Sequence, residues 1–427
     1  MPPKIYSDLR YLFLQGPIGP LFRLLGERMK REGVHIFRIN LCGGDYYDWR
    51  EPATDFAGRM AEWPAFVDHY IQDNAITDML LFGDCRPYHM AAIKIAKARG
   101  VRVHVLEEGY IRPDWMTLEH GGVNGHSQMP SDPEYFLEAA KALTPREQSP
   151  HVTASFSRRT RDGFWHYANQ LLDGGRFPYY EWHRPGSLLF DAVYWAHKLI
   201  RQKLQKSPDK QLENFIAEKG GSFFLLPLQL SADYQIRLHS PFPDMTSALC
   251  YIVDNFKHHA PPDTHLLIKS HPLYAGFFSW SAYIKKLAKR TGLTGRLQYI
   301  DGGDLERMCA AANGMVCVNS TSATFALNAG RPVAILGSDI YNMRGITHQG
   351  LLDEFWSNPT PPDREVFDAF CRVLRARYLV RGGVSSQSAV ATLVETMATR
   401  LLADRDYDNL PVSVSRKAES QASILSK

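Results

Sequence analysis

Apolar strand-like runs alternate with helix-like stretches along both halves of this chain, and this alternation constrains the fold more than any other feature. In the first half, strands are expected at residues 11–15, 34–41, 78–82 and 101–106, and helices at 20–32 and 88–99. Buried strands joined by crossover helices form parallel sheets that are covered on both faces. The first half therefore predicts a doubly wound α/β domain.

The second half of the chain repeats the pattern. Strands are expected at 222–228, 265–268, 297–299, 314–318 and 332–336, and helices at 245–258, 280–291, 305–312 and 323–329. Together the halves predict two Rossmann-like α/β domains facing a cleft, the arrangement of GT-B-like glycosyltransferases. The expected domains are 1–205, with a basic and aromatic helical segment, and 206–400, followed by a polar, disordered tail at 401–427.

Composition and motifs exclude several classes of protein. No window approaches the roughly 20 apolar residues of a membrane-spanning helix. The 6 cysteines show no CxxC spacing and residues 1–10 lack the apolar core of a signal peptide, so a cytoplasmic chain with free thiols and no metal site is expected. No GxGxxG or P-loop lysine follows the first strand, which removes the usual support for dehydrogenases and P-loop NTPases.

The positive charge of the chain is concentrated in its middle. The net charge is +4, and residues 151–210 hold ten Lys and Arg against five Asp and Glu, so the remainder is almost neutral. This distribution favours one local basic surface over general nucleic-acid binding.

Fold alone does not fix function, so chemistry is sought beyond the carboxyl ends of the strands, where open parallel sheets bind ligands. Glu107 and Glu108 end the fourth expected strand, and crowding of two carboxyls raises a pKa and suits general acid/base chemistry. A surface turn in which Arg112 pairs with one of them is the alternative. Asp233 follows the first strand of the second half and fits either a nucleophile or a helix N-cap.

Cations and hydroxyls follow two further strands of the second half. Lys269 and His271 could hold an anionic leaving group, with Pro272 fixing the turn, although a loop histidine without a ligand is common. The hydroxyls of Ser320–Ser322 open a helix, where they suit an anion site or a plain N-cap.

A glycine-containing turn follows the first strand of the chain. Gln15 is followed by Gly16 and, after two residues, by Gly19. These glycines either let the backbone approach a ligand or serve only to make the turn.

Taken together, these motifs resemble those of the bacterial capsule polysaccharide biosynthesis proteins of the KpsS/LipB type. The resemblance spans roughly residues 10–380, and its most specific part is the string at 107–125. The other strings that carry it lie at 15–17, 83–89, 229–242, 269–272 and 319–327.

The resemblance implies a retaining β-Kdo transferase that takes Kdo, an acidic eight-carbon keto sugar, from CMP-β-Kdo without a metal or other cofactor. The implied acceptor is phosphatidylglycerol or its lyso form on the cytoplasmic face of the inner membrane, where the product primes the poly-Kdo linker of the capsule. Retention would use two displacements with two carboxyls. Another CMP-sugar transferase resembling the sialyltransferases, and a non-catalytic capsule assembly or export factor, remain as alternatives.

The resemblance also implies roles for individual residues. Asp233 matches the nucleophile and Glu108 the acid/base, although the family often has Asp at the second position. The CMP phosphate would be held by Lys269, His271, Pro272, Ser320, Thr321 and Ser322. The sugar and acceptor would be bound by Gln15, Gly16, Gly19, Glu107, Arg112, Asn124 and Gln229.

The basic middle of the chain gains a role from the implied lipid acceptor. Residues 187–206 combine apolar and aromatic side chains with Lys198, Arg201, Lys203 and Lys206. Such a helix fits the anionic inner-membrane surface, with packing at the domain joint as the alternative. Other capsule biosynthesis or export proteins are possible partners.

Overall fold

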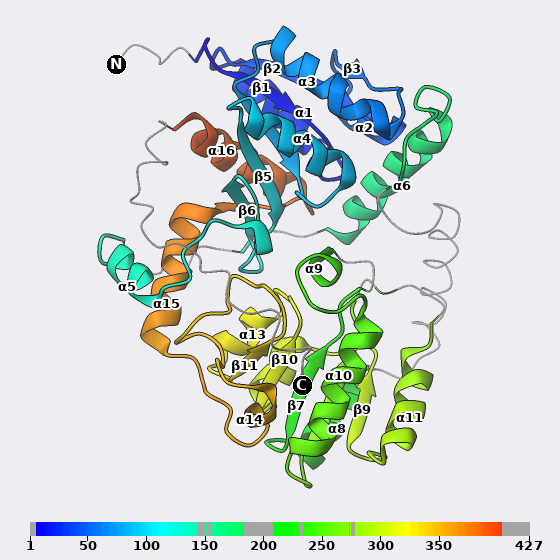
Figure 1. Cartoon of the computed structure of the whole chain (residues 1–427), viewed down its shortest axis with the longest axis vertical. Helices are drawn as coiled ribbons and strands as arrows, with labels where there is room; N and C mark the ends of the chain where they lie inside the picture. The colour runs from blue at the N-terminus through cyan, green and yellow to red at the C-terminus, as the bar shows by residue number, and fades with distance from the viewer. Residues whose placement is uncertain are drawn as a thin grey trace. The chain divides into compact units, whose positions relative to one another are not determined.

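The computed structural model describes residues 6–143, 151–152, 155–182, 208–230, 234–272, 274 and 278–403. The chain divides into two compact units, each an α/β fold (Figure 1). The first unit comprises residues 1–128, 144–183 and 373–413, and the second comprises 129–143, 184–372 and 414–427. Within the described residues, no helix combines the length and the apolar character needed to cross a membrane.

A sheet of seven strands among the described residues forms the first unit, in the order β12-β6-β5-β4-β1-β2-β3. Its strands are β1 (Arg10–Phe13), β2 (His35–Asn40), β3 (Thr54–Asp55), β4 (Asp78–Phe82), β5 (Arg102–Glu108), β6 (Trp115–His120) and β12 (Leu379–Arg381). Strands β1 to β5 pair in parallel, whereas β6 pairs antiparallel with both β5 and β12. The order of the parallel strands reverses between β1 and β4, which is where doubly wound sheets bind ligands.

Helices cover both faces of this sheet. They are α1 (Leu21–Lys30), α2 (Gly43–Trp49), α3 (Trp63–Asp73), α4 (Pro87–Ala98), α6 (Phe156–Leu172) and α16 (Gln387–Leu402). Alternate residues of β1 point to opposite faces: Tyr11 and Phe13 pack with α1 and α16, while Leu12 packs with α3 and α4. Fully buried parallel strands of this kind explain the continuous apolar runs in the sequence.

The second unit has a five-stranded, wholly parallel sheet among the described residues, in the order β11-β10-β7-β8-β9. Its strands are β7 (Phe223–Pro227), β8 (His265–Lys269), β9 (Leu297–Ile300), β10 (Gly314–Cys317) and β11 (Val333–Ile335). This order has the same connectivity as the strands β5-β4-β1-β2-β3 of the first unit. The strand order of the second sheet reverses between β7 and β10. The two units therefore offer equivalent ligand positions.

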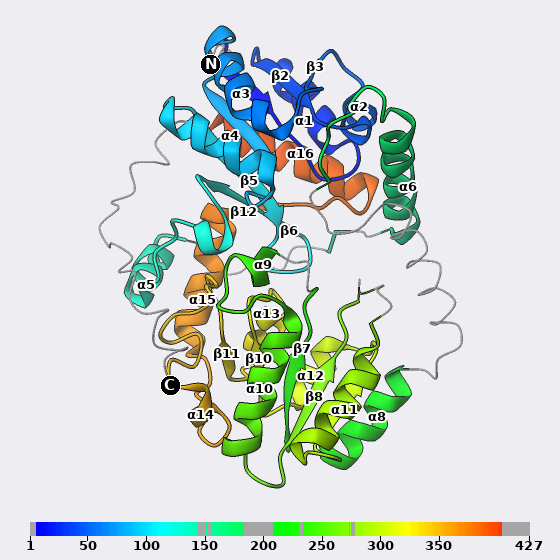
Figure 2. The same ribbon diagram turned by 45° about the vertical axis from the view of Figure 1, so that its right-hand side comes forward.

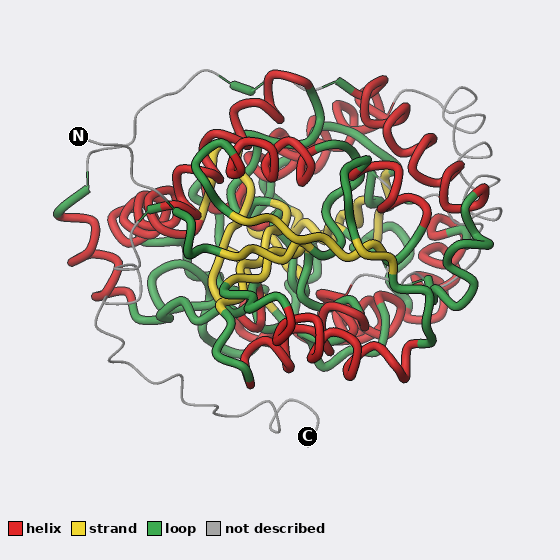
Figure 3. Tube along the Cα trace, turned by 90° about the horizontal axis from the view of Figure 1, so that it is seen from above, coloured by secondary structure: helices red, strands yellow, loops and turns green. Residues whose placement is uncertain are grey.

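The helices of the second unit also flank their sheet, and Figure 3 shows strands lying between layers of helices. They are α5 (Pro133–Lys141), α8 (Pro208–Lys219), α9 (Tyr234–Arg237), α10 (Met245–His259), α11 (Trp280–Thr291), α12 (Leu305–Ala311), α13 (Ala323–Asn328), α14 (Leu352–Phe355) and α15 (Arg364–Val373). The core contains apolar residues of α10, α11 and α14 packed on alternate strand residues such as Phe224 and Leu226. Local sequence signals bound these helices: Asp244 caps α10, and Gly292 ends α11 with a φ of +74°.

The fold class of two Rossmann-like α/β units is confirmed, but the division of the chain differs from the predicted boundaries. The second domain was expected to run from 206 to 400, yet β12 and α16 belong to the first unit. The physical reason is that β12 extends the first sheet beside β6, and that α16 buries its apolar side against α1. The predicted tail lies outside the described residues from 404 onward, as does the basic segment at 187–206.

Candidate functional site

Each unit places a glutamine just beyond its first strand and a basic residue at a matching position of the neighbouring strand. Gln15 lies two residues after Phe13, which pairs with Arg38 of β2. Gln229 lies two residues after Pro227, which pairs with Lys269 of β8. The first polar edge is defined here as Gln15, Arg38, Asp45, Arg86 and Glu107. The second polar edge is Gln229, Lys269, Ser270, Asn319 and Ser320–Ser322.

Arg38, the buried cation of the first polar edge, has a carboxylate partner inside the protein. Arg38 is buried and lies 3.2 Å from the Asp45 carboxylate, which also accepts hydrogen bonds from the Gln15 amide and the Leu41 N–H at 3.0 Å each. Burial lowers the pKa of Arg38, and the charge of Asp45 opposes that change. The Gln15 amide donates in addition to the Tyr180 hydroxyl at 3.1 Å. The side chain of Gln15 is therefore committed to the protein's own network.

The two adjacent glutamates at the end of β5 lie in different environments. Burial raises the pKa of Glu107 to about 7, helped by the charges of Glu108 and Asp84 and opposed by the Glu108 N–H and by Arg86. A Cβ at Gly83 would lie 3.1 Å from the Glu107 carboxylate, so the turn after β4 closes over it. Glu107 can therefore exchange a proton near neutrality.

Glu108 differs from Glu107 in lying between two arginines. Its carboxylate is 3.7 Å from the Arg112 guanidinium and 3.6 Å from that of Arg159 in α6. Arg112 thus pairs with the second glutamate of the pair rather than with Glu107. Glu108 therefore has two ion-pair partners within the first unit.

The turn after β1 uses its glycines for packing and backbone geometry. A Cβ at Gly16 would lie 2.8 Å from the Phe22 ring. Gly19 has a φ of +107°, and its N–H donates to Asp48 at 3.2 Å. Asn124, farther along the chain, donates its N–H to the Tyr110 hydroxyl at 2.6 Å. Each of these residues has a structural task within the first unit.

The second polar edge is held together by Gln229. Its amide donates to the Asn319 carbonyl at 2.5 Å and accepts from the Asn319 N–H at 3.0 Å. This reciprocal pair joins the ends of β7 and β10 where the strand order reverses. In the following turn, the Ser320 and Ser322 hydroxyls are 2.5 Å apart and the Ser320 hydroxyl accepts from the Ser322 N–H at 3.3 Å.

The end of β8 presents a cation without a carboxylate at ion-pair distance among the described residues. Lys269 is buried and donates to the Ser270 carbonyl at 3.3 Å. Burial lowers the pKa of Lys269, and the charge of Asp301 acts in the opposite direction. The Ser270 hydroxyl is also buried and has no hydrogen-bond partner within the described structure. A buried cation beside an unsatisfied hydroxyl is suited to an anionic ligand.

The remaining predicted residues of this edge are placed as follows. His271 is half-buried and Pro272 exposed, directly after Lys269 and Ser270. Thr321 contributes its carbonyl to the Thr324 hydroxyl at 2.7 Å. Asp233 lies outside the described residues. The structure thus brings Gln229, Lys269 and Ser320–Ser322 to neighbouring strand ends of one sheet, and Gln15 and Glu107 to those of the other.

Sequence reasoning missed several charged residues at these edges. Arg38 lies in β2 and Asp45 in α2, seven residues later, and they meet because the chain turns back between these two elements. Arg86 follows β4, as a strand-end search would have found. Asp339 follows β11, and burial raises its pKa to about 7 against the Tyr341 and Ile340 N–H groups. The position after the last strand of the second sheet was the signal that could have identified it.

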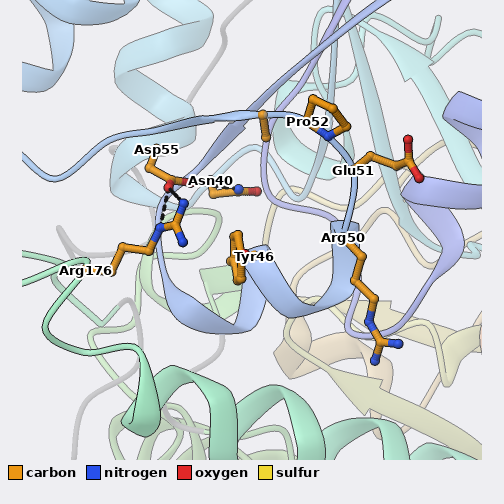
Figure 4. A pocket seen from close by; sticks show the side chains of 8 residues that line it. Asn40, Tyr46, Arg50, Glu51, Pro52, Asp55 and Arg176 are labelled. Atoms are coloured by element: carbon orange, nitrogen blue, oxygen red, sulfur yellow. Dashed lines mark hydrogen bonds and ion pairs between the residues drawn. The ribbon is translucent and has the colours of Figure 1, made fainter.

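A polar pocket of about 290 Å³ opens in the first unit (Figure 4). Its lining residues are Asn40, Tyr46, Arg50, Glu51, Pro52, Ala53, Asp55 and Arg176. Figure 4 shows Arg176 meeting Asp55, and the two are 2.5 Å apart. The Asn40 amide donates to the same carboxylate at 2.9 Å. The pocket's central groups therefore satisfy one another.

The chain resembles known proteins over most of its length. Residues 77–384 match the model of the capsule polysaccharide biosynthesis protein family. The chain belongs to this capsule polysaccharide biosynthesis family. It is 34% identical over 368 residues to the capsule polysaccharide modification protein LipB of Neisseria meningitidis serogroup B, covering 84% of this chain and 87% of that protein. It is 31% identical over 368 residues to the capsule polysaccharide export protein KpsS of Escherichia coli, covering 86% of this chain and 94% of KpsS.

Among solved structures, this member of the capsule polysaccharide biosynthesis family is similar to the β-Kdo 2,7 transferase KpsC of Thermosulfurimonas dismutans. The two share 15% identity with a TM-score of 0.43, over 90% of this chain and 99% of the other.

Proposed function

We propose that this protein is a retaining β-Kdo transferase that moves Kdo from CMP-β-Kdo to phosphatidylglycerol or lyso-phosphatidylglycerol. The observation that carries the proposal is the second polar edge, at the ligand-binding end of a parallel sheet. There the buried Lys269 has no carboxylate at ion-pair distance among the described residues, and the hydroxyl of the next residue, Ser270, is buried without a hydrogen-bond partner among them. Membership in the capsule polysaccharide biosynthesis family supports a transferase over other users of nucleotides. The donor and the acceptor are identified by the transfer assay described below.

The proposed reaction has two displacements. A carboxylate oxygen of Asp233 bonds to the anomeric carbon of Kdo while the bond from that carbon to the phosphate oxygen breaks, and CMP leaves with the electron pair. The acceptor hydroxyl then attacks the same carbon, its proton passes to an enzyme carboxylate, and the Asp233 ester bond breaks. Net retention follows because each displacement inverts the carbon once.

One glutamate of the pair at the end of β5 supplies the proton acceptor. The family pattern assigns this role to Glu108, whose carboxylate lies 3.7 Å from the Arg112 guanidinium and 3.6 Å from that of Arg159, two groups that can orient it. The pKa of Glu107, raised to about 7 by burial, makes the first glutamate a competitor for the same role. The proposal keeps Glu108 as acid/base and Glu107 in contact with sugar or acceptor.

The donor's phosphate is assigned to Lys269, His271 and the hydroxyls of Ser320–Ser322, with Pro272 shaping the turn. Arg112 and Asn124 are proposed to bind sugar or acceptor. Gln15 and Gln229 are proposed to act through the backbone and side chains they position, because their amides are engaged within the protein. No metal is assigned, since protein donors meet the phosphate charge. We propose a cytoplasmic location, peripheral to the inner membrane, where the lipid acceptor lies.

The test is a transfer assay with the full chain, a lyso-phosphatidylglycerol analogue as acceptor, and either CMP-Kdo or CMP-sialic acid as donor. Kdo transfer that is lost in Asp233→Asn and in Glu108→Gln supports the proposal. Glu107→Gln is the variant for comparison within the pair. If Glu107→Gln loses all transfer activity while Glu108→Gln retains it, Glu107 is the acid/base instead of Glu108. Transfer of sialic acid alone would establish a different CMP-sugar transferase. Capsule complementation by Asp233→Asn without any transfer would indicate an assembly factor and overturn the proposal.

A further inference from the structure

Helix α6 packs on the first unit through its polar side. His166 is buried and its Nδ1 lies 2.7 Å from the Asp48 carboxylate of α2. Gly43 and Gly44 permit this close packing, because a Cβ at Gly44 would lie 2.4 Å from the His166 ring. Figures 1 and 2 both show α6 lying alongside α2. The helix is thus fixed to the unit by the His166–Asp48 hydrogen bond, by close backbone contact and, at the edge of its exposed side, by the stacking of Trp165 on Tyr47.

An apolar stripe runs along the exposed side of α6. The exposed fractions are 63% for Phe164, 45% for Trp165, 58% for Leu171 and 78% for Leu172. Spacings of one, seven and eight residues place these side chains along one face of a helix. Soluble proteins rarely expose several large apolar side chains in one contiguous patch without a partner.

The charges beside this outward stripe are two arginines that share one carboxylate. Arg161 is on the same helical face, three residues before Phe164, and its side chain is 66% exposed. It lies 3.6 Å from the Asp162 carboxylate, which also lies 3.3 Å from the Arg158 guanidinium, so one positive charge remains uncompensated within this group. On the neighbouring α2 side, Tyr47 stacks on Trp165 with ring centroids 6.4 Å apart, and the guanidinium of Arg50 lies 4.0 Å from the Tyr47 ring. Arg161 therefore lies on the same face as the stripe, and Arg50 contacts the Tyr47 ring that stacks on Trp165.

We propose that the outward face of α6, defined by Phe164, Trp165, Leu171 and Leu172 with Arg161, docks on an anionic lipid surface. Phe, Trp and Leu insert into the boundary between headgroups and acyl chains, and arginines beside them pair with anionic headgroups. The positive charge favours this partner over a neutral protein groove. This surface is separate from the two polar edges, so the proposal does not depend on the transfer reaction.

The test measures cosedimentation of the full chain with vesicles of phosphatidylcholine, with and without phosphatidylglycerol. Wild type is expected to bind the phosphatidylglycerol vesicles and to bind the neutral ones weakly. Phe164→Ser with Leu172→Ser is expected to weaken binding at least tenfold, because both side chains would lose their insertion into lipid. Arg161→Gln is expected to weaken it about fivefold, and added salt is expected to do the same.

Met90→Ser with Leu351→Ser is the matched control, since these residues are 46% and 66% exposed on other elements. The control is expected to bind like wild type. Unchanged thermal unfolding of every variant excludes misfolding as the cause of lost binding. Vesicle binding by wild type that survives Phe164→Ser with Leu172→Ser overturns the proposal. An absence of vesicle binding by wild type also overturns the proposal. If sedimentation velocity then finds a dimer that the double variant dissociates, this face is a self-association surface.

Discussion

The two polar edges have the same topology but handle their buried cations differently. In the first, Arg38 is paired with Asp45, and Gln15 binds the same carboxylate. In the second, Lys269 has no carboxylate at ion-pair distance within the described structure, and Gln229 binds the Asn319 backbone instead. A cation whose charge is already compensated stabilises a fold, whereas an uncompensated one favours an anionic ligand. The difference assigns a structural task to the Arg38–Asp45 pair of the first edge and supports the proposed nucleotide binding at the second.

Arg38→Met gives the largest expected effect. The substitution leaves the Asp45 carboxylate buried without its guanidinium, which costs about 3–5 kcal/mol in comparable buried pairs. Hydrogen exchange of first-unit peptides during urea denaturation measures this loss separately from the second unit. Arg38→Met combined with Asp45→Asn is the control and is expected to recover part of the stability, because the amide oxygen still accepts from the Leu41 N–H while the buried charge is gone. A loss below about 1 kcal/mol in the single variant would contradict the paired-cation assignment.

Lys269→Met is expected to behave in the opposite way. Removing a buried cation that has no carboxylate partner in the described part of the chain leaves stability unchanged or raised, because its desolvation cost disappears. Affinity for CMP is expected to fall roughly tenfold to a hundredfold, the value of a charge-assisted hydrogen bond to phosphate. Calorimetry with CMP measures the affinity, and cytidine, which lacks the phosphate, is the control ligand. Equal losses for CMP and cytidine would show that Lys269 does not face the phosphate.

The elements of the two sheets were largely predictable because each is a buried apolar run. The predicted strand at 78–82 and helix at 280–291 coincide with β4 and α11, and α10 extends one residue beyond its predicted end. Strands β6 and β12 were missed because they pair antiparallel, and β12 has only three residues whose partner lies far away in the sequence. The return of α16 to the first unit depends on this same long-range pairing.

The strand-end positions of the candidate site were predictable, but the state of each side chain was not. Local sequence places Lys269 at the end of a strand and Arg38 within one. Only the folded sheet shows that Arg38 meets Asp45 and that burial raises the pKa of Glu107. These contacts depend on how the strand ends and the turns after them come together, and periodicity carries no signal for that.

The pH dependence of stability sharpens the comparison within the first edge. Burial raises the pKa of Glu107 from an ordinary 4.5 to about 7, so the folded state retains a proton that the unfolded state releases between these values. Its contribution to stability is fully present below about pH 4.5 and is lost as pH rises through 7. Glu107→Gln is therefore expected to be about 3 kcal/mol more stable than wild type at pH 8 and nearly equal to it at pH 4. Urea denaturation across this range measures the difference, and an equal pH response in Glu108→Gln would contradict the separation of the two carboxyls.

Ser270→Ala gives the smallest expected effect on stability and tests whether the second edge is prepared for a ligand. The Ser270 hydroxyl is buried without a hydrogen-bond partner among the residues that the structure describes, so its removal is expected to leave stability unchanged or to raise it by up to about 1 kcal/mol. If the donor's phosphate supplies the missing partner, the same substitution weakens CMP binding about fivefold, as measured by calorimetry. Ser240→Ala is the control, because that hydroxyl is already bonded to the Ile236 carbonyl at 2.6 Å. Ser240→Ala is expected to lower stability, because it removes this hydrogen bond, and to leave CMP affinity unchanged. A Ser270→Ala variant that is destabilised and binds CMP normally would mean that the hydroxyl serves the fold, and the contrast between the two edges would then rest on Lys269 alone.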